Sequence, residues 1–152
     1  MTGVEIPEFY YDDVEVGAEL TTASHVIAYE DILAFADITL DKHPLHTDED
    51  FCRTTRFGRP IAHGLYGLAL MEGLKSKMYE RTSIASLGWD KIRFEAPLFP
   101  GDEVFVKVIF VDKRDSRKPG RGIVREEMLL INQSGGVVIS AEHTTLLIKR
   151  PE

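Results

Sequence analysis

The second half of the chain contains a succession of long runs rich in Val, Ile and Leu, and this feature most constrains the fold. The runs cover residues 84–94, 103–112, 122–132 and 137–148. Segments rich in Pro and Gly separate them, at 97–102, 118–120 and 133–136. β-branched residues favour strands, and such turn-forming clusters end them. The pattern predicts a meander of antiparallel strands.

A helical pattern precedes these runs. From about His63 to residue 79, apolar residues recur at helical spacing, interrupted by Gly64, Gly67 and Gly73. Glycine costs helix stability, so its presence indicates close packing against strands or a ligand. Earlier, the chain predicts a strand over 20–28, a helix from Tyr29, a Pro-containing loop over 39–46 and a short helix within 48–57. No alternating β/α units occur, so we expect an α+β fold in which a sheet packs on one long helix.

The length and net charge of the chain limit the number of domains and the kinds of binding partner to be expected. The 152 residues fit one domain, 1–152. A formal net charge of -7 repels polyanions, which argues against nucleic-acid or membrane partners. The single cysteine rules out an internal disulfide, and the acidic N-terminal stretch lacks the basic and apolar regions of a signal peptide. Because no apolar run approaches the roughly 20 residues that span a bilayer, we expect a cytoplasmic protein.

The loop that follows the first helix carries a candidate acid/base pair. Asp41 and His46 stand five positions apart with Pro44 between them. A fully extended segment would separate the two side chains by up to about 17 Å. A fold-back at Pro44 would bring both within reach of one water molecule, as general acid/base catalysis requires. The alternative is an ordinary polar loop in which Asp48 caps the next helix.

A second segment leads directly into the glycine-rich helix. Residues 57–65 read F-G-R-P-I-A-H-G-L. The first N–H groups of a helix have no intrahelical acceptor, and Gly64 has no Cβ to block an approaching oxygen. Such a site would stabilise a thioester oxygen that becomes negative in a transition state. The alternative is a tight turn followed by a packing glycine.

Three segments together resemble a known family. They are D-K-H-P-L-H-T-D at 41–48, F-G-R-P-I-A-H-G-L at 57–65 and W-D-K-I-R-F-E-A-P-L-F-P-G-D-E-V at 89–104. In this order and spacing they resemble the MaoC-like dehydratases, which include the (R)-specific enoyl-CoA hydratases. The resemblance spans about residues 11–148. It implies a hotdog fold, with a curved antiparallel sheet wrapped around a long central helix. It also implies a homodimer or dimer of dimers, with acyl-CoA bound near the subunit boundary.

The resemblance also implies a reaction. Asp41 and His46 would hold a water molecule, and the backbone N–H of Gly64 would polarise the thioester carbonyl. The enzyme would then be a hydro-lyase that needs no cofactor. It would add water across the 2,3 double bond of a 2-enoyl-CoA to give a 3-hydroxyacyl-CoA, or catalyse the reverse reaction.

Four further residues are predicted to bind substrate: His43, Arg59, His63 and Leu65. His43 stands where hydratases of this family commonly have Asn. It is interpreted as a substitute orienting residue, as the mark of a different acyl substrate, or as a surface residue. A polar or dicarboxylic acyl chain is one hypothesis for the substrate, because Lys42 and Arg59 lie nearby in the sequence.

Other classes remain open at this point. Asp41, His43, His46, Asp48 and His63 include the usual ligands of a metal, but their spacing matches no metal motif, and no metal is predicted. A hotdog thioesterase would use a carboxylate to direct water at the carbonyl carbon instead of C3. A non-catalytic acyl-CoA binding protein would not need an acid/base pair.

Overall fold

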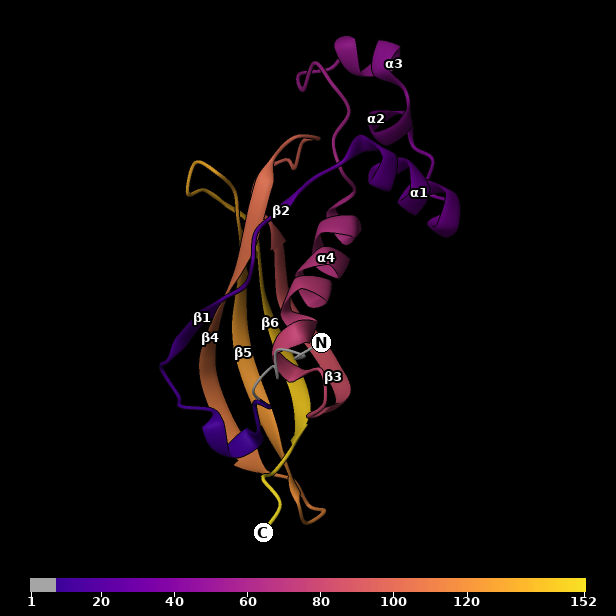
Figure 1. The fold of residues 1–152 in the computed structure, drawn as a ribbon. Helices are drawn as coiled ribbons and strands as arrows, with labels where there is room; N and C mark the ends of the chain where they lie inside the picture. The colour runs from indigo at the N-terminus through magenta and orange to yellow at the C-terminus, as the bar shows by residue number, and fades with distance from the viewer. Residues whose placement is uncertain (1–7) are drawn as a thin grey trace, which may run out of the picture.

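The computed structural model describes residues 8–152 (Figure 1). Residues 1–7 lie outside it, including the start of the stretch in which no targeting signal was recognised. The α-helices are α1 (Tyr29–Thr39), α2 (Pro44–Thr47), α3 (Glu49–Arg53) and α4 (Gly64–Ser76). Short 3-10 helices are η1 (Tyr11–Asp13) and η2 (Lys77–Tyr79). The strands are β1 (Glu19–Thr21), β2 (His25–Val26), β3 (Ser83–Phe94), β4 (Glu103–Asp115), β5 (Arg121–Ile131) and β6 (Val137–Ile148).

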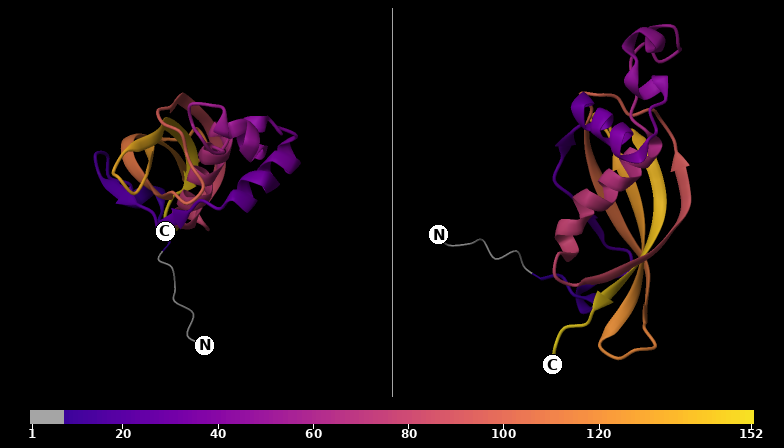
Figure 2. Two further views of the ribbon diagram at one scale, coloured as in Figure 1. Left: turned by 90° about the horizontal axis from the view of Figure 1, so that it is seen from above. Right: turned by 90° about the vertical axis from the view of Figure 1, so that its right-hand side faces the viewer.

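One antiparallel sheet curves around helix α4. The strand order is β1-β4-β5-β6-β3, and β2 also pairs with β4. The two views of Figure 2 show the sheet bending around α4, while α1, α2 and α3 gather at one end of the molecule. The predicted architecture, a long helix wrapped by a curved antiparallel sheet, is confirmed. Within residues 8–152, no helix is long and apolar enough to cross a membrane.

The core lies between α4 and the sheet. From Val104 to Phe110 on β4 and along most of β5 every second residue is buried, as a strand with one covered face requires. Gly67 allows α4 to approach the sheet closely, because a Cβ at this position would lie 2.5 Å from Cδ1 of Ile139 on β6. The close packing against strands predicted from the helix glycines is therefore confirmed at Gly67.

The predicted meander is correct for β4, β5 and β6 but wrong for β3. Strand β3 pairs with β6 at the edge of the sheet and does not touch β4. Its connection to β4 contains Pro97 and Pro100. Proline has no N–H to donate to a ladder, so this segment does not form a tight hairpin. It instead carries the chain from one side of the sheet to the other, past the start of α4.

The predicted strand over 20–28 is broken into β1 and β2. Thr22 causes the interruption, because its hydroxyl oxygen accepts the N–H of Val106 at 3.0 Å. The side chain thereby takes the place of a backbone acceptor in the ladder. The chain resumes pairing with β4 only at His25.

The predicted loop over 39–46 contains a helical turn, α2. Pro44 occupies its first position, where a missing N–H costs nothing. The Nδ1 of His43 accepts the N–H of Leu45 at 3.1 Å and caps the turn. Asp48 caps α3 by accepting the N–H of Phe51 at 3.0 Å, as the capping interpretation predicted. His46 therefore projects from a short helix and not from an irregular loop.

A set of mostly buried polar side chains, here called the buried network, joins the C-terminal end of α4 to the sheet. Its buried members are Lys75, Tyr79, Glu126 and His143, and the exposed Ser86 lies at its edge. Lys75 donates to Glu126 and lies 2.8 Å from Nδ1 of His143, whose Nε2 lies 2.6 Å from the Ser86 hydroxyl. Tyr79 donates to the other oxygen of Glu126 at 2.8 Å. Burial alone would raise the pKa of Glu126, but hydrogen bonds with His143 and Lys75 outweigh it and lower the pKa.

Candidate active site

Three hydrogen bonds hold the two sequence motifs side by side. The N–H of Ile61 donates to the carbonyl of Leu45 at 3.0 Å. Nδ1 of His46 lies 2.7 Å from the carbonyl oxygen of Ile61, and Nε2 of His63 lies 2.8 Å from that of Asp41. A carbonyl oxygen only accepts, so each of these ring nitrogens carries the proton. The segment before α4 is thus fastened to the turn that carries Asp41 and His46.

Asp41, His46 and His63 form one group, here called the pocket cluster. One side-chain donor atom from each lies within 4.8 Å of the others. The rings of His46 and His63 are stacked, with centroids 3.7 Å apart and an interplanar angle of 27°. Leu40 adopts a left-handed conformation with φ 68°, which ends α1 and turns the chain at Asp41. The predicted pair is therefore brought together, and His63 joins it.

The environment of His46 favours its neutral form. Burial lowers the pKa of its imidazole, more than the hydrogen bond to Ile61 raises it, and the neighbouring His63 lowers it further. A neutral imidazole near pH 7 can accept a proton. Asp41 is exposed, and its Oδ1 accepts a long hydrogen bond of 3.4 Å from the N–H of His43.

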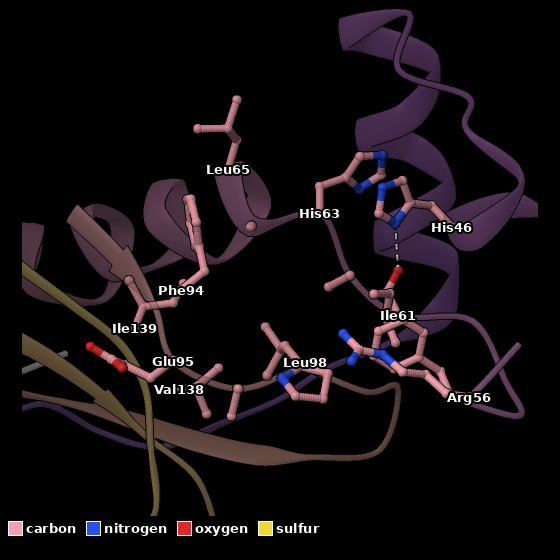
Figure 3. Close-up of a pocket in the computed structure, with 15 residues that line it drawn as sticks. His46, Arg56, Ile61, His63, Leu65, Phe94, Glu95, Leu98, Val138 and Ile139 are labelled. Atoms are coloured by element: carbon pink, nitrogen blue, oxygen red, sulfur yellow. Dashed lines mark hydrogen bonds between the residues drawn. The ribbon is translucent and has the colours of Figure 1, made fainter.

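A cavity of about 430 Å³ lies beside the pocket cluster (Figure 3). Its volume falls within the roughly 300–1,000 Å³ typical of small-molecule sites. The wall is mostly apolar and comes from several segments: His46, 56–57, 61–65, 94–98, Val138 and Ile139. Figure 3 shows His46 and His63 at one end of this space and Glu95 at the other.

Gly64 is the first residue of α4 and lines this cavity. Its N–H belongs to the first turn and has no intrahelical acceptor. A Cβ at this position would lie 2.6 Å from the ring of Phe94. Glycine therefore leaves room both for Phe94 and for a ligand atom that approaches the N–H.

The residues predicted to bind substrate fall into two groups. His63 and Leu65 line the cavity. Arg59 stacks on the ring of Phe99 at 4.2 Å, and His43 caps α2; neither is among the lining residues. The cap shows that the imidazole of His43 can act as an amide would at this position, because Nδ1 supplies the acceptor that an amide oxygen would supply.

Two charged residues of the wall were not singled out from the sequence. Arg56 and Glu95 both line the cavity. Lys42, which the sequence suggested as a substrate contact, pairs with Asp37 at 3.4 Å instead. Arg56 lies next to the recognised motif at 57–65, and that proximity was the one available signal. Glu95 lies within the motif at 89–104 but resembled an ordinary surface residue.

The geometry of the pocket cluster disfavours a metal ion. Zinc binds nitrogen and oxygen donors at about 2.0–2.2 Å, with the lone pair of each imidazole directed at the metal. Tetrahedral zinc ligands at these lengths are roughly 3.4 Å apart, whereas the ligand atoms of Asp41, His46 and His63 are spread over up to 4.8 Å. The prediction of no metal remains the simpler interpretation.

Comparison with known proteins shows that residues 13–130 match the family described as MaoC like domain. The chain belongs to the MaoC-like family. One relative, a 3-hydroxybutyryl-CoA dehydratase of Methylorubrum extorquens, is 32% identical over 117 residues, covering 77% of this chain and 73% of that protein. Another, an (R)-specific enoyl-CoA hydratase of Aeromonas caviae, is 31% identical over 129 residues, covering 85% of this chain and 92% of that protein. These relatives confirm the predicted hydro-lyase class.

Solved structures confirm the fold of this MaoC-like protein. The X-ray structure of a protein described as a monoamine oxidase regulatory protein from Archaeoglobus fulgidus has a TM-score of 0.85 at 30% identity, covering 95% of this chain and 97% of that one. A Mycobacterium tuberculosis protein described as a double hotdog fold also has a TM-score of 0.85, at 24% identity, covering 95% of this chain and 46% of that one. The predicted hotdog fold is therefore confirmed.

Proposed function

We propose that this MaoC-like protein adds water across the 2,3 double bond of a 2-enoyl-CoA to give a 3-hydroxyacyl-CoA, or catalyses the reverse dehydration. Asp41 and His46 hold the water, and the N–H of Gly64 polarises the thioester. The observation that carries the proposal is the position of the pocket cluster, beside the first turn of α4 and at one end of a mostly apolar cavity.

The chemistry follows from these positions. The water oxygen bonds to C3 while one of its protons passes to the Asp41/His46 pair. The electrons of the double bond move onto the thioester, whose oxygen gains negative charge and accepts the N–H of Gly64. The N-terminal end of α4 adds favourable potential at this oxygen. The Asp41/His46 pair then gives a proton to C2, where the electrons returning from the thioester oxygen form the C–H bond; the carbonyl re-forms, and the side chains return to their starting state.

The test combines absorbance and thiol assays. Purified protein is mixed with 2-enoyl-CoAs of short, medium, branched and carboxylated acyl chains, and loss of the enoyl-thioester absorbance is followed while free thiol is measured. Hydration predicts absorbance loss without thiol, and both Asp41→Asn and His46→Ala abolish it. Thiol release would assign a thioesterase instead, and absorbance loss that survives both substitutions would remove the pair from the mechanism.

We also propose that two copies associate along β3. This strand forms one edge of the sheet, and within residues 8–152 its only strand neighbour there is β6. It carries exposed apolar side chains at Ile84, Leu87 and Phe94. Unpaired edges with apolar side chains favour pairing with another chain. Because Phe94 also lines the cavity, the substrate would lie at the subunit boundary. Light scattering of the purified protein and of Leu87→Lys tests this: the wild type should be dimeric, and the variant should dissociate.

A further inference from the structure

His63 has hydrogen-bonding capacity that the fold does not use. Its side chain is 3% exposed, and its Nε2–H is committed to the carbonyl of Asp41. In the neutral ring Nδ1 is therefore an acceptor. Among the described residues, this buried Nδ1 has no hydrogen-bond partner. A buried acceptor without a donor is unfavourable, and such atoms in native proteins call for an explanation.

Packing holds the His63 ring in this orientation. Phe35 contacts it edge-on with centroids 4.9 Å apart, and His46 stacks on it. As the residue preceding α4, His63 could have capped the helix, but its side chain makes no capping hydrogen bond. It lines the cavity next to Gly64. The ring is therefore fixed beside the place where the proposed reaction occurs, with a free lone pair.

The spacing of the pocket cluster matches a single oxygen atom. Hydrogen bonds of about 2.8 Å arranged tetrahedrally around a water place its partners about 4.6 Å apart. One ring nitrogen or carboxylate oxygen of each of Asp41, His46 and His63 lies within 4.8 Å of the others, and Nδ1 is the ring nitrogen of His63 that the fold leaves uncommitted. The same rule that fixes Nε2–H on His63 fixes Nδ1–H on His46, which leaves Nε2 of His46 as its acceptor.

We propose that Nδ1 of His63 is a third hydrogen-bond partner of the reacting oxygen, alongside Asp41 and His46. The inference rests on the proposed hydration and adds a catalytic residue to it. His63 has two roles. Its Nε2–H positions Asp41 by a hydrogen bond to the Asp41 carbonyl, and its Nδ1 contacts the water or the 3-hydroxyl group.

Contact of one water with Asp41, His46 and His63 also determines how many protons these three side chains carry. Water has two hydrogens, so it can contact three acceptors only when one of them is protonated and donates to the oxygen. During hydration one water proton passes to an unprotonated member of the cluster as the C3–O bond forms. The proton already held by the cluster passes to C2, whose new C–H bond uses the electrons that had moved onto the thioester. The cluster ends with one proton, as it began.

The substitutions His63→Gln and His63→Asn separate the two roles of His63. In His63→Gln the amide can occupy the place of Nε2 and still donate to the Asp41 carbonyl, but nothing replaces Nδ1. In His63→Asn the amide lies near the place of Nδ1 and can contact the water, while the bond to Asp41 is lost. His25→Gln on β2 is the matched control, because His25 is outside the pocket cluster and does not line the cavity.

The experiment measures kcat, KM and the pH dependence of kcat for these variants with an enoyl-CoA that the wild type hydrates, with circular dichroism as a check on folding. His63→Gln should lose on the order of 10²-fold in kcat with little change in KM. His63→Asn should keep more activity than His63→Gln, and both should change the shape of the pH profile. His25→Gln should match the wild type.

The opposite ranking would overturn the proposal. If His63→Gln keeps full kcat and the wild-type pH profile while His63→Asn is impaired, His63 acts only through its bond to Asp41. That result leaves the hydratase proposal intact, provided that Asp41→Asn and His46→Ala are inactive. Absence of hydration by the wild type across the enoyl-CoA panel would instead count against the proposed function itself.

Discussion

The two ends of helix α4 each hold histidine beside a carboxylate, yet their hydrogen bonding differs. In the buried network at the C-terminal end, His143 and Glu126 are fully buried and each is bonded to several partners. In the pocket cluster at the N-terminal end, Asp41 is exposed, and the described residues offer no partner to Nδ1 of His63. Polar groups whose hydrogen bonds are all made within the protein stabilise the fold, whereas polar groups with a free lone pair can act on a ligand.

The buried network includes a connection that superficially resembles a nucleophile triad. The hydroxyl of Ser86 contacts Nε2 of His143, and Nδ1 of His143 lies 2.9 Å from Glu126. The ammonium of Lys75 lies 2.8 Å from the same Nδ1 and can only donate to it. Either Nδ1 accepts from Lys75 and Nε2–H donates to Ser86, or Nδ1–H donates to Glu126; in both cases none of these residues lines the cavity beside the pocket cluster. The geometry therefore supports a structural role for the network.

The largest expected effect is on catalysis, from Asp41→Asn. Removing one member of an acid/base pair costs about 10²–10⁴-fold in rate. Because Asp41 is exposed, the melting temperature should change little. Steady-state kinetics and thermal denaturation on the same preparation check both halves of this expectation. A large loss of stability would show that the pocket cluster is structural after all.

In the buried network the same kind of change should act on stability. Glu126→Ala removes the buried carboxylate of the Lys75 ion pair and leaves Glu72, 3.4 Å from the ammonium, as its remaining acidic partner; breaking a buried pair typically costs about 3–5 kcal/mol. Urea unfolding measures this loss, and kcat per folded molecule should stay near the wild-type value. The double variant Lys75→Met/Glu126→Met removes both charges and should recover much of the stability. A catalytic defect in the folded double variant would contradict the purely structural role of the buried network.

The sequence revealed the repeating features of the fold better than its long-range pairings. Runs rich in Val, Ile and Leu between turn-forming segments predicted the long strands, and helical spacing predicted α4, because both signals are local in the sequence. The place of β3 beside β6 depends on the path of residues 95–102 across the sheet, and local patterns do not encode it. The break at Thr22 likewise results from one side chain, whose hydroxyl oxygen replaces a backbone acceptor for an N–H group of β4.

The candidate site shows the same division. Asp41, His46 and Gly64 were predicted through family resemblance, because their motifs are contiguous in the sequence. The contact between His46 and His63 joins residues 17 positions apart and arises from the bonds that fasten Ile61 to α2. The buried network was missed because Lys75, Glu126 and His143 lie on three different elements, and each alone resembles a surface residue.

A pair of helix glycines sharpens the contrast within α4 itself. Gly64→Ala places a methyl group against Phe94 and beside the N–H that the thioester oxygen must reach. A displacement of about 1 Å at a reacting group can cost on the order of 10²-fold, so we expect a loss of that size in kcat/KM. Gly73→Ala is the matched control, because a Cβ there meets nothing within 4 Å. It should leave activity unchanged and stabilise the helix by roughly 0.5–1 kcal/mol. Equal activity in the two variants would remove Gly64 from the thioester site.

The smallest effects are expected from pH, and they separate the two clusters again. Burial lowers the pKa of His46, so its imidazole stays neutral below the ordinary value of about 6.5. The acid limb of kcat/KM should therefore fall below that pH, and His46→Ala should abolish it together with the activity.

The pKa of Glu126 is also lowered, but this residue acts on folding and not on catalysis, and it stabilises the fold in its charged form. Its stabilisation is complete above the unfolded value of about 4.3 and is lost as pH falls through the folded pKa. On acidification, activity should consequently disappear before the protein unfolds. Kinetics and denaturation midpoints from pH 3 to 8 test this order, and coincident loss of activity and folding would show that the clusters are not independent.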